Sequence, residues 1–277
     1  MYSGHFIEID ATKDAVISNN KFMYSKPSSS EIKEAINIDT PDKLTNGWSS
    51  KWSKFDKTPN TNMTIENNVF YELDRAIGTH KYSGGKYHDQ IIIKNNKIEK
   101  MRQDAIRVLN WSNATIENNT FKDVDPGKNN ANRGIFASGA IKPTFQNNLF
   151  DNIPRAIQFT PWKNSNSGSE YDVTYNELSK ENKEALSSNT VINYVEDFIR
   201  INPKYKKYDK EHTEFIPVKT AQKDSSDPET KDFMKQNTNK GCSENIISFY
   251  ENPFYSKVLL LHFQNHWMNH WEMCQTI

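Results

Sequence analysis

Two short motifs alternate along the chain, and their recurrence constrains the fold more than any other feature. The first motif is a short apolar strand: HFIEID from His5, EAINID from Glu34, RAIGTH from Arg75, DAIRVL from Asp104, RGIFAS from Arg133 and RAIQFT from Arg155. The second motif ends in paired asparagines: AVISNNKF, MTIENNVF, IIIKNNKI, ATIENNTF and PTFQNNLF. Apart from one longer insertion, the first motif recurs at intervals of 22 (155 − 133) to 29 (34 − 5) residues. Units this short cannot bury their apolar side alone, so they must stack as a solenoid.

The β character of both motifs predicts an all-β fold, a right-handed parallel β-helix. A leucine-rich repeat has a similar period but requires leucines at fixed offsets, and this frame lacks them. The paired asparagines have a structural role in this fold, because asparagine tolerates left-handed backbone angles and stacked copies can form a hydrogen-bonded ladder. Their first members are Asn19, Asn67, Asn95, Asn118 and Asn147.

Composition excludes several classes of function. The 35 basic and 35 acidic side chains cancel, so no bulk field favours nucleic acid or an anionic membrane. The apolar stretch near the end, 258–261, is far shorter than the roughly 20 residues of a spanning helix, which predicts no membrane insertion. Two cysteines cannot make a disulfide framework. The segment MYSGHFIEID carries no visible signal peptide.

The repeat divides the chain into three parts. Residues 1–203 are predicted to form the β-helix domain, with a helix over 176–185 near its end. Residues 204–240 are polar and aperiodic, which is typical of a linker. Residues 241–277 are an atypical tail, disordered or helical, in which one helix face could place histidines for a transition metal: His262, His266 and His270. Because the repeat starts at once, we expect N-terminal coils to be missing, and a complete chain to be a monomer.

The alternation of x-A-I-x-x-x with T-I-x-N-N-x-F resembles the pectate-lyase-like β-helix superfamily, in particular β-helix proteins attached to Gram-positive surfaces. The resemblance covers about residues 4 to 200. It implies an extracellular or cell-wall location and a polysaccharide or glycan partner. It does not select one activity, since the superfamily includes lyases, hydrolases, epimerases, phage tailspikes and non-catalytic adhesins.

Alignment of the first motif gives columns of residues that stack at roughly 4.8 Å between coils. The isoleucine column and the next but one point inward. By the period-two rule the alternate columns face solvent. These outward columns are Glu8, Asn37, Gly78, Arg107, Phe136 and Gln158, followed by Asp10, Asp39, His80, Leu109, Ser138 and Thr160.

Two insertions follow Asp39 and His80 and predict the walls of a cleft on this face. The first insertion carries Trp48 and Trp52, which suit stacking on sugar rings or pin the loop to the solenoid. The second is KYSGGKY, whose glycines permit a tight return. This return would gather candidate catalytic residues beside the cleft: His80, Lys81, Tyr87 and His88. His88 could equally be a strand-start residue that bonds the loop backbone.

The column before the cleft alternates in charge: His5, Glu34, Arg75, Asp104, Arg133 and Arg155. It most simply forms a ladder of ion pairs at a turn, worth under about 1 kcal/mol each if exposed. Arg75, Asp104 and Asn37 are also candidate substrate-binding residues. Arg107 differs, because its column neighbours are glycine and phenylalanine, so we predict an unpaired clamp for a uronate carboxylate.

The leading hypothesis is a polysaccharide lyase or epimerase that abstracts a proton from an acidic polysaccharide. His80 would be the base, Tyr87 or Lys81 the acid, and Arg107 the charge stabiliser, with Asp39 beside them. A hydrolase would instead use Asp10 and Asp39, at a coil spacing near the roughly 5 Å of retaining enzymes. No cofactor is required, although calcium could bind Glu8, Asp10 and Asp39.

Two other hypotheses compete with the enzyme. A non-catalytic adhesin module would hold glycans in the same cleft with tryptophans, Arg107 and polar ladders. A truncated fragment of either protein would retain the surface without the activity. The sequence identifies neither the polysaccharide nor the role of the tail.

Overall fold

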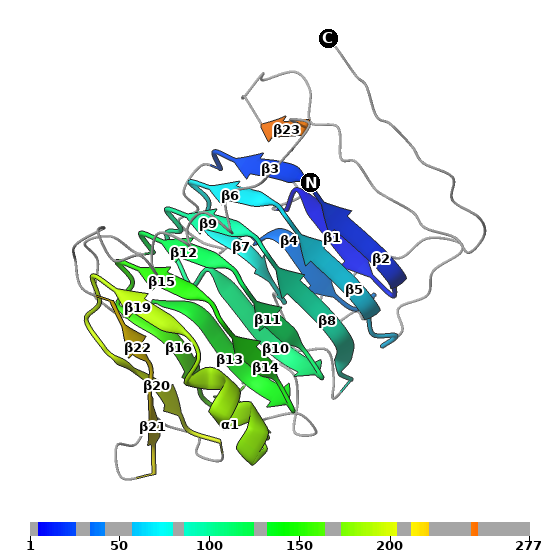
Figure 1. Cartoon of the computed structure of the whole chain (residues 1–277). Coiled ribbons are helices and arrows are strands. Elements are labelled where there is room, and N and C mark those ends of the chain that lie inside the picture. Colours follow the sequence, from blue (N-terminus) through cyan, green and yellow to red (C-terminus); the bar gives the residue numbers. More distant parts are fainter. Residues whose placement is uncertain are drawn as a thin grey trace.

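Stacked parallel strands form a solenoid that rises along one axis (Figure 1). The computed structural model describes residues 5–25, 34–41, 57–79, 86–124, 132–163, 173–203, 212–221 and 245–248. Each coil contributes strands to three faces, and every pairing between consecutive coils on these faces is parallel. The prediction of an all-β parallel β-helix is confirmed.

The first face carries the first sequence motif. Its strands are β1 (Ile7–Asp10), β4 (Glu34–Asp39), β7 (Arg75–Gly78), β10 (Ile106–Ser112), β13 (Arg133–Ile141), β16 (Arg155–Phe159) and β20 (Phe198–Ile201). β21 (Glu214–Pro217) pairs antiparallel with β20 at the C-terminal end of this face. The observed register matches the predicted columns: Asp10 is opposite Asp39, and Arg107 is opposite both Gly78 and Phe136.

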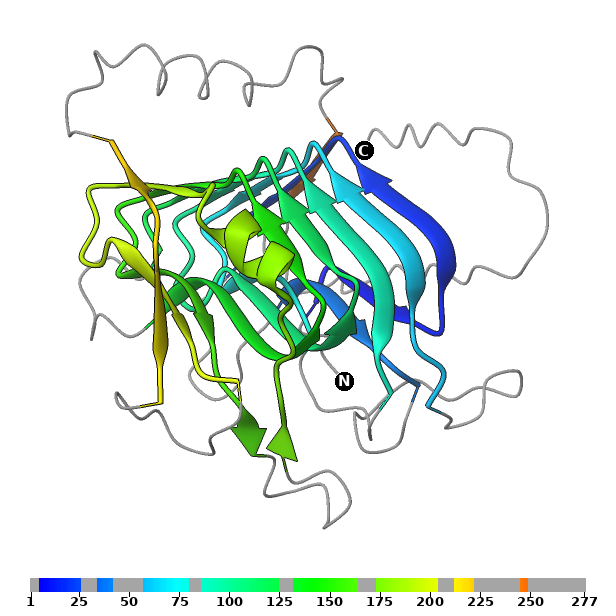
Figure 2. The ribbon, with the colours of Figure 1, turned by 60° about the horizontal axis from the view of Figure 1, so that its bottom comes forward.

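The second face carries the strand that precedes each asparagine pair. Its strands are β2 (Lys13–Ser18), β5 (Thr61–Glu66), β8 (His88–Lys94), β11 (Thr115–Glu117) and β14 (Thr144–Gln146). Helix α1 (Lys180–Leu186) packs against β14 and lies beside the green strands of the solenoid in Figure 2. A capping box fixes its start, because Ser179 and Asn182 each bond the other's backbone N–H. The predicted helix is therefore present, although it begins four residues later than expected.

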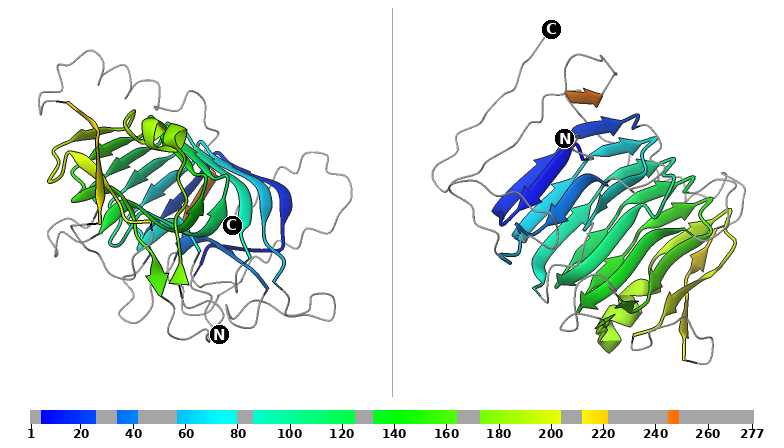
Figure 3. Two further views of the ribbon diagram at one scale, coloured as in Figure 1. Left: turned by 90° about the horizontal axis from the view of Figure 1, so that it is seen from below. Right: turned by 180° about the vertical axis from the view of Figure 1, so that it is seen from behind.

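The third face follows each asparagine pair. Its strands are β3 (Asn20–Met23), β6 (Val69–Tyr71), β9 (Lys97–Glu99), β12 (Thr120–Lys122), β15 (Leu149–Asp151), β19 (Thr190–Ile192) and β22 (Lys219–Thr220), with β23 (Asn245–Ser248) beside β3. β21 and β22 lie within the segment predicted to be a linker, and β23 lies within the predicted tail. A separate pair, β17 (Trp162–Lys163) and β18 (Val173–Thr174), is antiparallel. Two further views show the same order of strands along the axis (Figure 3).

The two members of each asparagine pair have different roles, one through its backbone conformation and the other through its side chain. The first members have left-handed φ values, for example 55° at Asn118 and 52° at Asn147. The second members form the ladder and are buried from Asn68 onward: Asn119 Nδ2 donates to Asn148 Oδ1 at 3.0 Å, and Asn148 Nδ2 donates to Asn189 Oδ1 at 2.9 Å. The predicted ladder is confirmed, and Asn189 extends it one coil beyond the repeats recognised in the sequence.

The interior of the solenoid is filled by the inward columns. The first-face isoleucines are packed with phenylalanines of the third face, which stack between coils: Phe22 on Phe70 at 4.9 Å, and Phe121 on Phe150 at 4.7 Å between ring centroids. Because every inward side chain touches its copies above and below, the outward side of the first face is held in a fixed register.

Candidate functional site

A ladder of ion pairs runs along the first face, two residues before the isoleucine column. The Arg75 guanidinium pairs with the Glu34 carboxylate, and its Nε donates to the Asp104 carbonyl oxygen at 3.1 Å. Arg133 clamps the Asp104 carboxylate with two bonds, Nε to Oδ1 at 2.7 Å and Nη2 to Oδ2 at 2.8 Å. The predicted ladder of alternating charge is present, and its central members Glu34, Arg75 and Asp104 are buried rather than exposed.

This burial bears on the predicted substrate-binding roles of Arg75 and Asp104. Arg75 is 1% exposed and Asp104 is 5% exposed. Their charged groups are already paired within the ladder, so they have little surface with which to contact a saccharide. Asn37, the third predicted substrate-binding residue, is likewise 1% exposed. These three residues therefore lie beneath the surface of the first face instead of on it.

Arg107 lies on the same face. It is not the unpaired arginine that its column predicted as a clamp for a uronate carboxylate. Its Cβ lies 3.0 Å from the place where a Cβ on Gly78 would be, so a side chain at position 78 would press on Arg107. Burial and the Arg75 charge lower the pKa of Arg107 to about 10, against the carboxylates of Glu34, Asp104 and Asp39, which raise it. The prediction was wrong because carboxylates of neighbouring columns, rather than of its own column, surround the guanidinium.

The acidic residues at the N-terminal end of the face are joined through an amide. Asn37 Nδ2 donates to Asp39 Oδ2 at 3.1 Å and to Glu8 Oε1 at 3.3 Å. A calcium ion needs oxygen atoms to converge, yet this N–H donor lies between the two carboxylates. Within the described residues no group of three acidic, histidine or cysteine side chains is placed to hold a metal. The set of Glu8, Asp10 and Asp39 therefore does not fit calcium as predicted.

The Asp39 carboxyl group is 1% exposed and its pKa is well above the usual 3.8. Desolvation is the main cause, opposed by the Asn37 hydrogen bond and reinforced by the charges of Glu8, Glu34 and Asp10. A carboxyl group so deeply buried cannot reach a polysaccharide. Asp39 thus has a perturbed pKa without the exposure that catalysis on a polymer requires.

His88 is a structural residue at the start of β8. The backbone N–H of Asn60 donates to His88 Nδ1 at 3.0 Å, so the ring proton resides on Nε2. Complete burial lowers the pKa of His88 from 6.5 to about 3. The ring is neutral and inaccessible, and the prediction of a catalytic role is wrong because the strand start turns into the solenoid. The alternative, a bond to the loop backbone, matches the structure.

Tyr87 is half-buried next to this strand start. Burial raises the pKa of the Tyr87 phenol, and the negative charge of Glu177 adds to the rise. The phenol is therefore protonated at neutral pH and is a weaker acid than free tyrosine. The remaining predicted site residues lie outside the described residues: Trp48, Trp52, His80 and Lys81.

A cavity of about 470 Å³ opens at the C-terminal end of the same face, outside β13, β16 and β20. We call it the arginine pocket, and its lining consists of Arg133, Phe136, Arg155, Gln158, Thr160, Pro161 and Arg200. The Arg133 guanidinium lies 4.3 Å from the centroid of the Phe136 ring, and Arg133 Nη1 donates to Gln158 Oε1 at 3.4 Å. The register of β16 and β20 places Gln158 opposite Arg200.

Two carboxylates partly neutralise the three arginines of the arginine pocket. Asp104 forms an ion pair with Arg133, and Glu196 forms ion pairs with Arg155 and Arg200. Arg200 Nε donates to Glu196 Oε2 at 2.9 Å, and Arg155 Nε lies 3.5 Å from Glu196 Oε1. Among the described residues, three guanidinium groups and two carboxylates leave one positive charge in excess. The arginine side chains are 15 to 25% exposed and line the cavity.

The outward columns were predicted to face solvent, and this prediction was wrong for most of their members. Phe136 and Gln158 are each 5% exposed, and Leu109 is 1% exposed. The direction of these side chains is as predicted. Their burial has a visible cause at Phe136, because the arginine of the preceding column folds over its ring.

Sequence reasoning missed the arginine pocket although it had most of its residues. Arg133 and Arg155 were assigned to the ladder, and Gln158 and Thr160 to the outward columns. The missing residue was Arg200, which belongs to the next coil but is separated from the repeats by α1. Alignment of FIRI with the first motif would have placed Arg200 in the Gln158 column.

The model of a family described as a right-handed β-helix region matches residues 2–178, well over half of the chain. The chain belongs to this right-handed β-helix family. The match covers the strands of all three faces from β1 to β18. Membership accounts for the solenoid and leaves the chemistry of its outer surface to be argued from the residues present.

Two solved structures are similar to this chain, both of PfbA, which is described as a surface protein and adhesin of Streptococcus pneumoniae. The first is 22% identical with a TM-score of 0.43, covering 75% of this chain and 51% of that one. The second is 20% identical with a TM-score of 0.43, covering 75% and 48%. This chain thus spans about half the length of those structures. No curated protein matches the sequence.

Within the described residues no helix is long and apolar enough to cross a membrane.

Proposed function

We propose that this protein is a surface module that binds an acidic glycan in the arginine pocket without chemical turnover. The observation that carries the proposal is the convergence of Arg133, Arg155 and Arg200 on one outward cavity. Guanidinium groups are the preferred partners of carboxylates, because their planar donors match both oxygen atoms. The net positive charge of the cavity favours an anion over a neutral ligand.

The size and polarity of the arginine pocket support a saccharide. A cavity of about 470 Å³ falls in the range of small-ligand sites, roughly 300 to 1000 Å³. The Gln158 amide and the Thr160 hydroxyl supply hydrogen-bonding groups for the hydroxyls of a sugar ring. Because Arg133 and Arg200 are held by buried or partly buried carboxylates, their guanidinium groups are fixed before a ligand binds.

A binding role is favoured over catalysis by the state of the predicted catalytic residues that the structure describes. Asp39 and His88 are inaccessible, and Tyr87 is protonated. The arginine pocket itself has no titratable base among its described lining residues. A uronate that enters it meets cations and hydrogen-bond donors, which bind it but do not abstract its proton.

Elimination of an acidic polysaccharide is the second candidate function. The observation that favours it is the proximity of Arg107 to Asp39, a carboxyl group whose pKa is raised well above its usual 3.8 by burial. This reaction requires His80 as the base. A surface or cell-wall location is part of both proposals.

The test measures binding and turnover in one sample. Purified protein is titrated calorimetrically with oligosaccharides of uronic acids and with neutral oligosaccharides of the same length, while ultraviolet absorbance records any unsaturated uronate. We expect the acidic ligands to bind, the affinity to fall with ionic strength, and the absorbance to stay flat. Arg155→Gln should weaken acidic binding about tenfold or more, since a charged hydrogen bond is worth about 1.5 to 3 kcal/mol.

Arg155 is the best residue to change because Arg200 keeps its two bonds to Glu196 when Arg155 is lost. Lys94→Gln is the matched control, since it removes one positive charge from the second face, where Lys94 pairs with Glu66 at 3.2 Å. Equal loss in both variants would contradict a specific site. A rise in absorbance that His80→Ala abolishes would establish elimination instead.

A further inference from the structure

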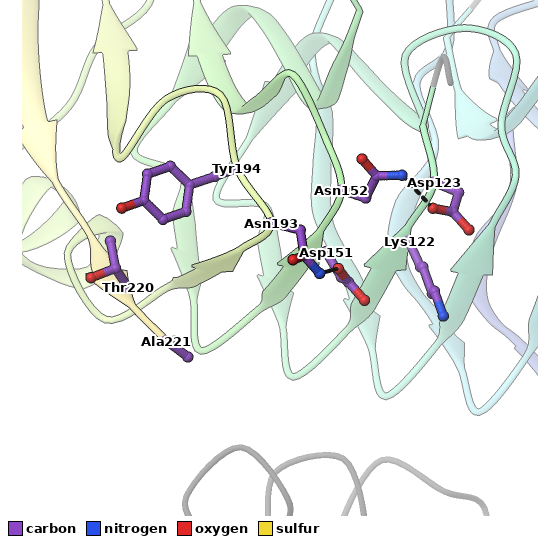
Figure 4. Close-up of a pocket in the computed structure, with 8 residues that line it drawn as sticks. All are labelled: Lys122, Asp123, Asp151, Asn152, Asn193, Tyr194, Thr220 and Ala221. Carbon is purple, nitrogen blue, oxygen red and sulfur yellow. Dashed lines mark hydrogen bonds between the residues drawn. The ribbon is translucent and has the colours of Figure 1, made fainter. Parts of the chain in front are cut away.

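A second cavity lies on another face of the solenoid, where the third-face strands end. It has a volume of about 1040 Å³, and we call it the corner groove. Its lining comes from four consecutive strands and the turns after them: Lys122, Asp123, Asp151, Asn152, Asn193, Tyr194, Thr220 and Ala221. Figure 4 shows these side chains in a row along the solenoid. We propose that the corner groove binds a neutral saccharide, independently of the arginine pocket.

The backbone at this corner presents its side chains in a regular series. Asp123, Asn152 and Asn193 occupy equivalent places in three consecutive coils, with φ values of 53°, 56° and 49°. Backbone bonds fix the stacking, since the Asp123 N–H donates to the Asp151 carbonyl oxygen at 3.0 Å, and the Asn152 N–H to the Ile192 carbonyl oxygen at 3.1 Å. Aspartate and asparagine adopt this left-handed conformation more readily than most residues other than glycine. The polar row is therefore set by the scaffold before any ligand arrives.

Each carboxylate in the corner groove is paired with an amide. Asn152 Nδ2 donates to Asp123 Oδ1 at 2.6 Å, and Asn193 Nδ2 donates to Asp151 Oδ1 at 2.7 Å. Figure 4 shows both pairs as dashed lines. Each pair retains one carboxylate oxygen, one amide oxygen and one amide hydrogen for other partners. Two adjacent hydroxyl groups of a sugar, each both a donor and an acceptor, match such a set.

An aromatic ring completes the lining at the C-terminal end of the corner groove. Tyr194 is 42% exposed, and it lies one residue after Asn193. The face of a tyrosine ring offers apolar contact to the C–H face of a sugar, and its hydroxyl offers a further hydrogen bond. Polar groups on one side and an aromatic face on the other are typical of sites that hold a small polyhydroxylated ligand.

The charge of the corner groove selects against uronates. Two carboxylates, on Asp123 and Asp151, face one ammonium group, on Lys122, so the described lining carries one net negative charge. Asp151 is 8% exposed and held by Asn193, so its charge is fixed in place. An acidic sugar would be repelled here and attracted to the arginine pocket, whose sign is opposite. The two cavities would thus divide neutral and acidic saccharides between them.

The experiment titrates the whole chain with neutral oligosaccharides of glucose, galactose and mannose, and with uronate oligosaccharides of the same length. Saturation-transfer NMR detects binding and calorimetry measures the Kd. We expect at least one neutral ligand to bind, and Tyr194→Ala to weaken it by about tenfold, the effect of a lost aromatic contact. Asp123→Asn keeps a residue suited to the left-handed turn and an Oδ1 that can accept from Asn152, and it should weaken binding by severalfold because the second carboxylate oxygen, an acceptor for a sugar hydroxyl, becomes an amide donor.

Tyr175→Ala is the matched control, since Tyr175 is 46% exposed and lies outside the corner groove. It should leave the Kd of the neutral ligand unchanged. Failure of every neutral ligand to bind would overturn the proposal, as would equal losses in Tyr194→Ala and Tyr175→Ala. Neutral binding that Arg155→Gln abolishes would also overturn it, because the ligand would then occupy the arginine pocket. Loss of uronate binding alone would count against the proposed function and leave the corner groove standing.

Discussion

The backbone N–H of Asn60 donates to Nδ1 of His88 at 3.0 Å, and the side chain of Asn60 occupies the same position one coil earlier. Asn60 in turn accepts the Thr12 N–H through its Oδ1 at 2.8 Å. In successive coils, the two side chains therefore each accept a hydrogen bond from a backbone N–H of the preceding coil, although only His88 can titrate. A histidine here is a ladder residue with an imidazole acceptor in place of an amide acceptor.

His88 makes the stability of the protein depend on pH. Its pKa is about 3 in the folded state and 6.5 when free, so protons bind more readily to the unfolded chain. The stabilisation is complete above pH 6.5 and is lost as the pH falls from 6.5 toward 3. One pKa unit corresponds to about 1.4 kcal/mol, so the expected loss at about pH 5 is roughly 2 kcal/mol.

His88→Asn should remove this dependence while keeping the acceptor for Asn60. We expect the urea midpoint of the parent to fall more between neutral and mildly acidic pH than that of the variant. Urea unfolding of both proteins across this pH range provides the comparison. Parallel pH profiles would contradict the burial of a neutral imidazole.

Asp39 gives the opposite dependence. Burial raises the pKa of this carboxyl group above its free value of 3.8, so the unfolded chain releases the proton first. Its contribution to stability is complete below 3.8 and is lost as the pH rises through the interval up to the folded pKa. Asp39→Asn should therefore be more stable than the parent at neutral pH, with the advantage shrinking toward pH 3.8. A variant less stable than the parent at every pH would show that the charge of Asp39 is needed.

The two asparagines of one pair should respond differently to mutation. Asn119 is fully buried and its Nδ2 donates to Ile93 O at 2.9 Å and to Asn148 Oδ1 at 3.0 Å. Asn119→Ala strands these acceptors, which should cost about 1 to 3 kcal/mol for each group left unsatisfied. Asn118→Gly should be close to neutral, because glycine adopts the φ of 55° without strain. Thermal or urea unfolding of both variants separates the side-chain role from the backbone role.

The strand register was predictable from the sequence because it follows from two regularities. Inward isoleucines must stack on inward isoleucines, and the side-chain period of two then fixes every outward neighbour. For this reason the sequence alone predicts the pairing of Asp10 with Asp39, and of Arg107 with Phe136. The helix α1 was predictable for a different reason, since its polar helix-forming residues interrupt the strand pattern.

The burial of the outward residues was not predictable in the same way. Periodicity gives the direction of a side chain, but it does not show whether a long neighbouring side chain covers it. The Arg133 side chain bends back over Phe136, and Arg75 fills the space between Glu34 and Asp104. Such contacts depend on rotamers of long side chains, which one aligned column does not reveal.

The corner groove was missed although a signal for it was present. Three consecutive third-face strands are each followed by an aspartate or asparagine that suits a left-handed turn, as in FKD, FDN and VIN. The sequence analysis aligned the strands and the asparagine pairs but not these turns. Alignment of the turns would have placed Asp123, Asn152 and Asn193 in one row.

Arg75 offers a test of whether the buried ladder is structural or binds ligand. It is 1% exposed and contacts the Glu34 carboxylate and two oxygen atoms of Asp104. Arg75→Ala leaves the fully buried Glu34 carboxylate without this cation, which should cost about 3 to 5 kcal/mol. The free energy of unfolding should fall by this amount, measured by urea denaturation.

The exposed pair on α1 supplies the control for Arg75. Lys180 lies 3.7 Å from Glu184, and their side chains are 85% and 66% exposed. Lys180→Ala should change the free energy of unfolding by no more than about 0.5 kcal/mol, as is usual for exposed helix pairs. If Arg75→Ala were as mild as this control while acidic glycan binding was lost, Arg75 would be a binding residue after all, and the ladder would have to open toward the arginine pocket. If Arg75→Ala instead lowers the free energy of unfolding strongly and leaves the affinity of the folded protein for acidic glycans unchanged, the ladder is structural. Its ion pairs would then serve only to hold Arg133 in place beside the arginine pocket.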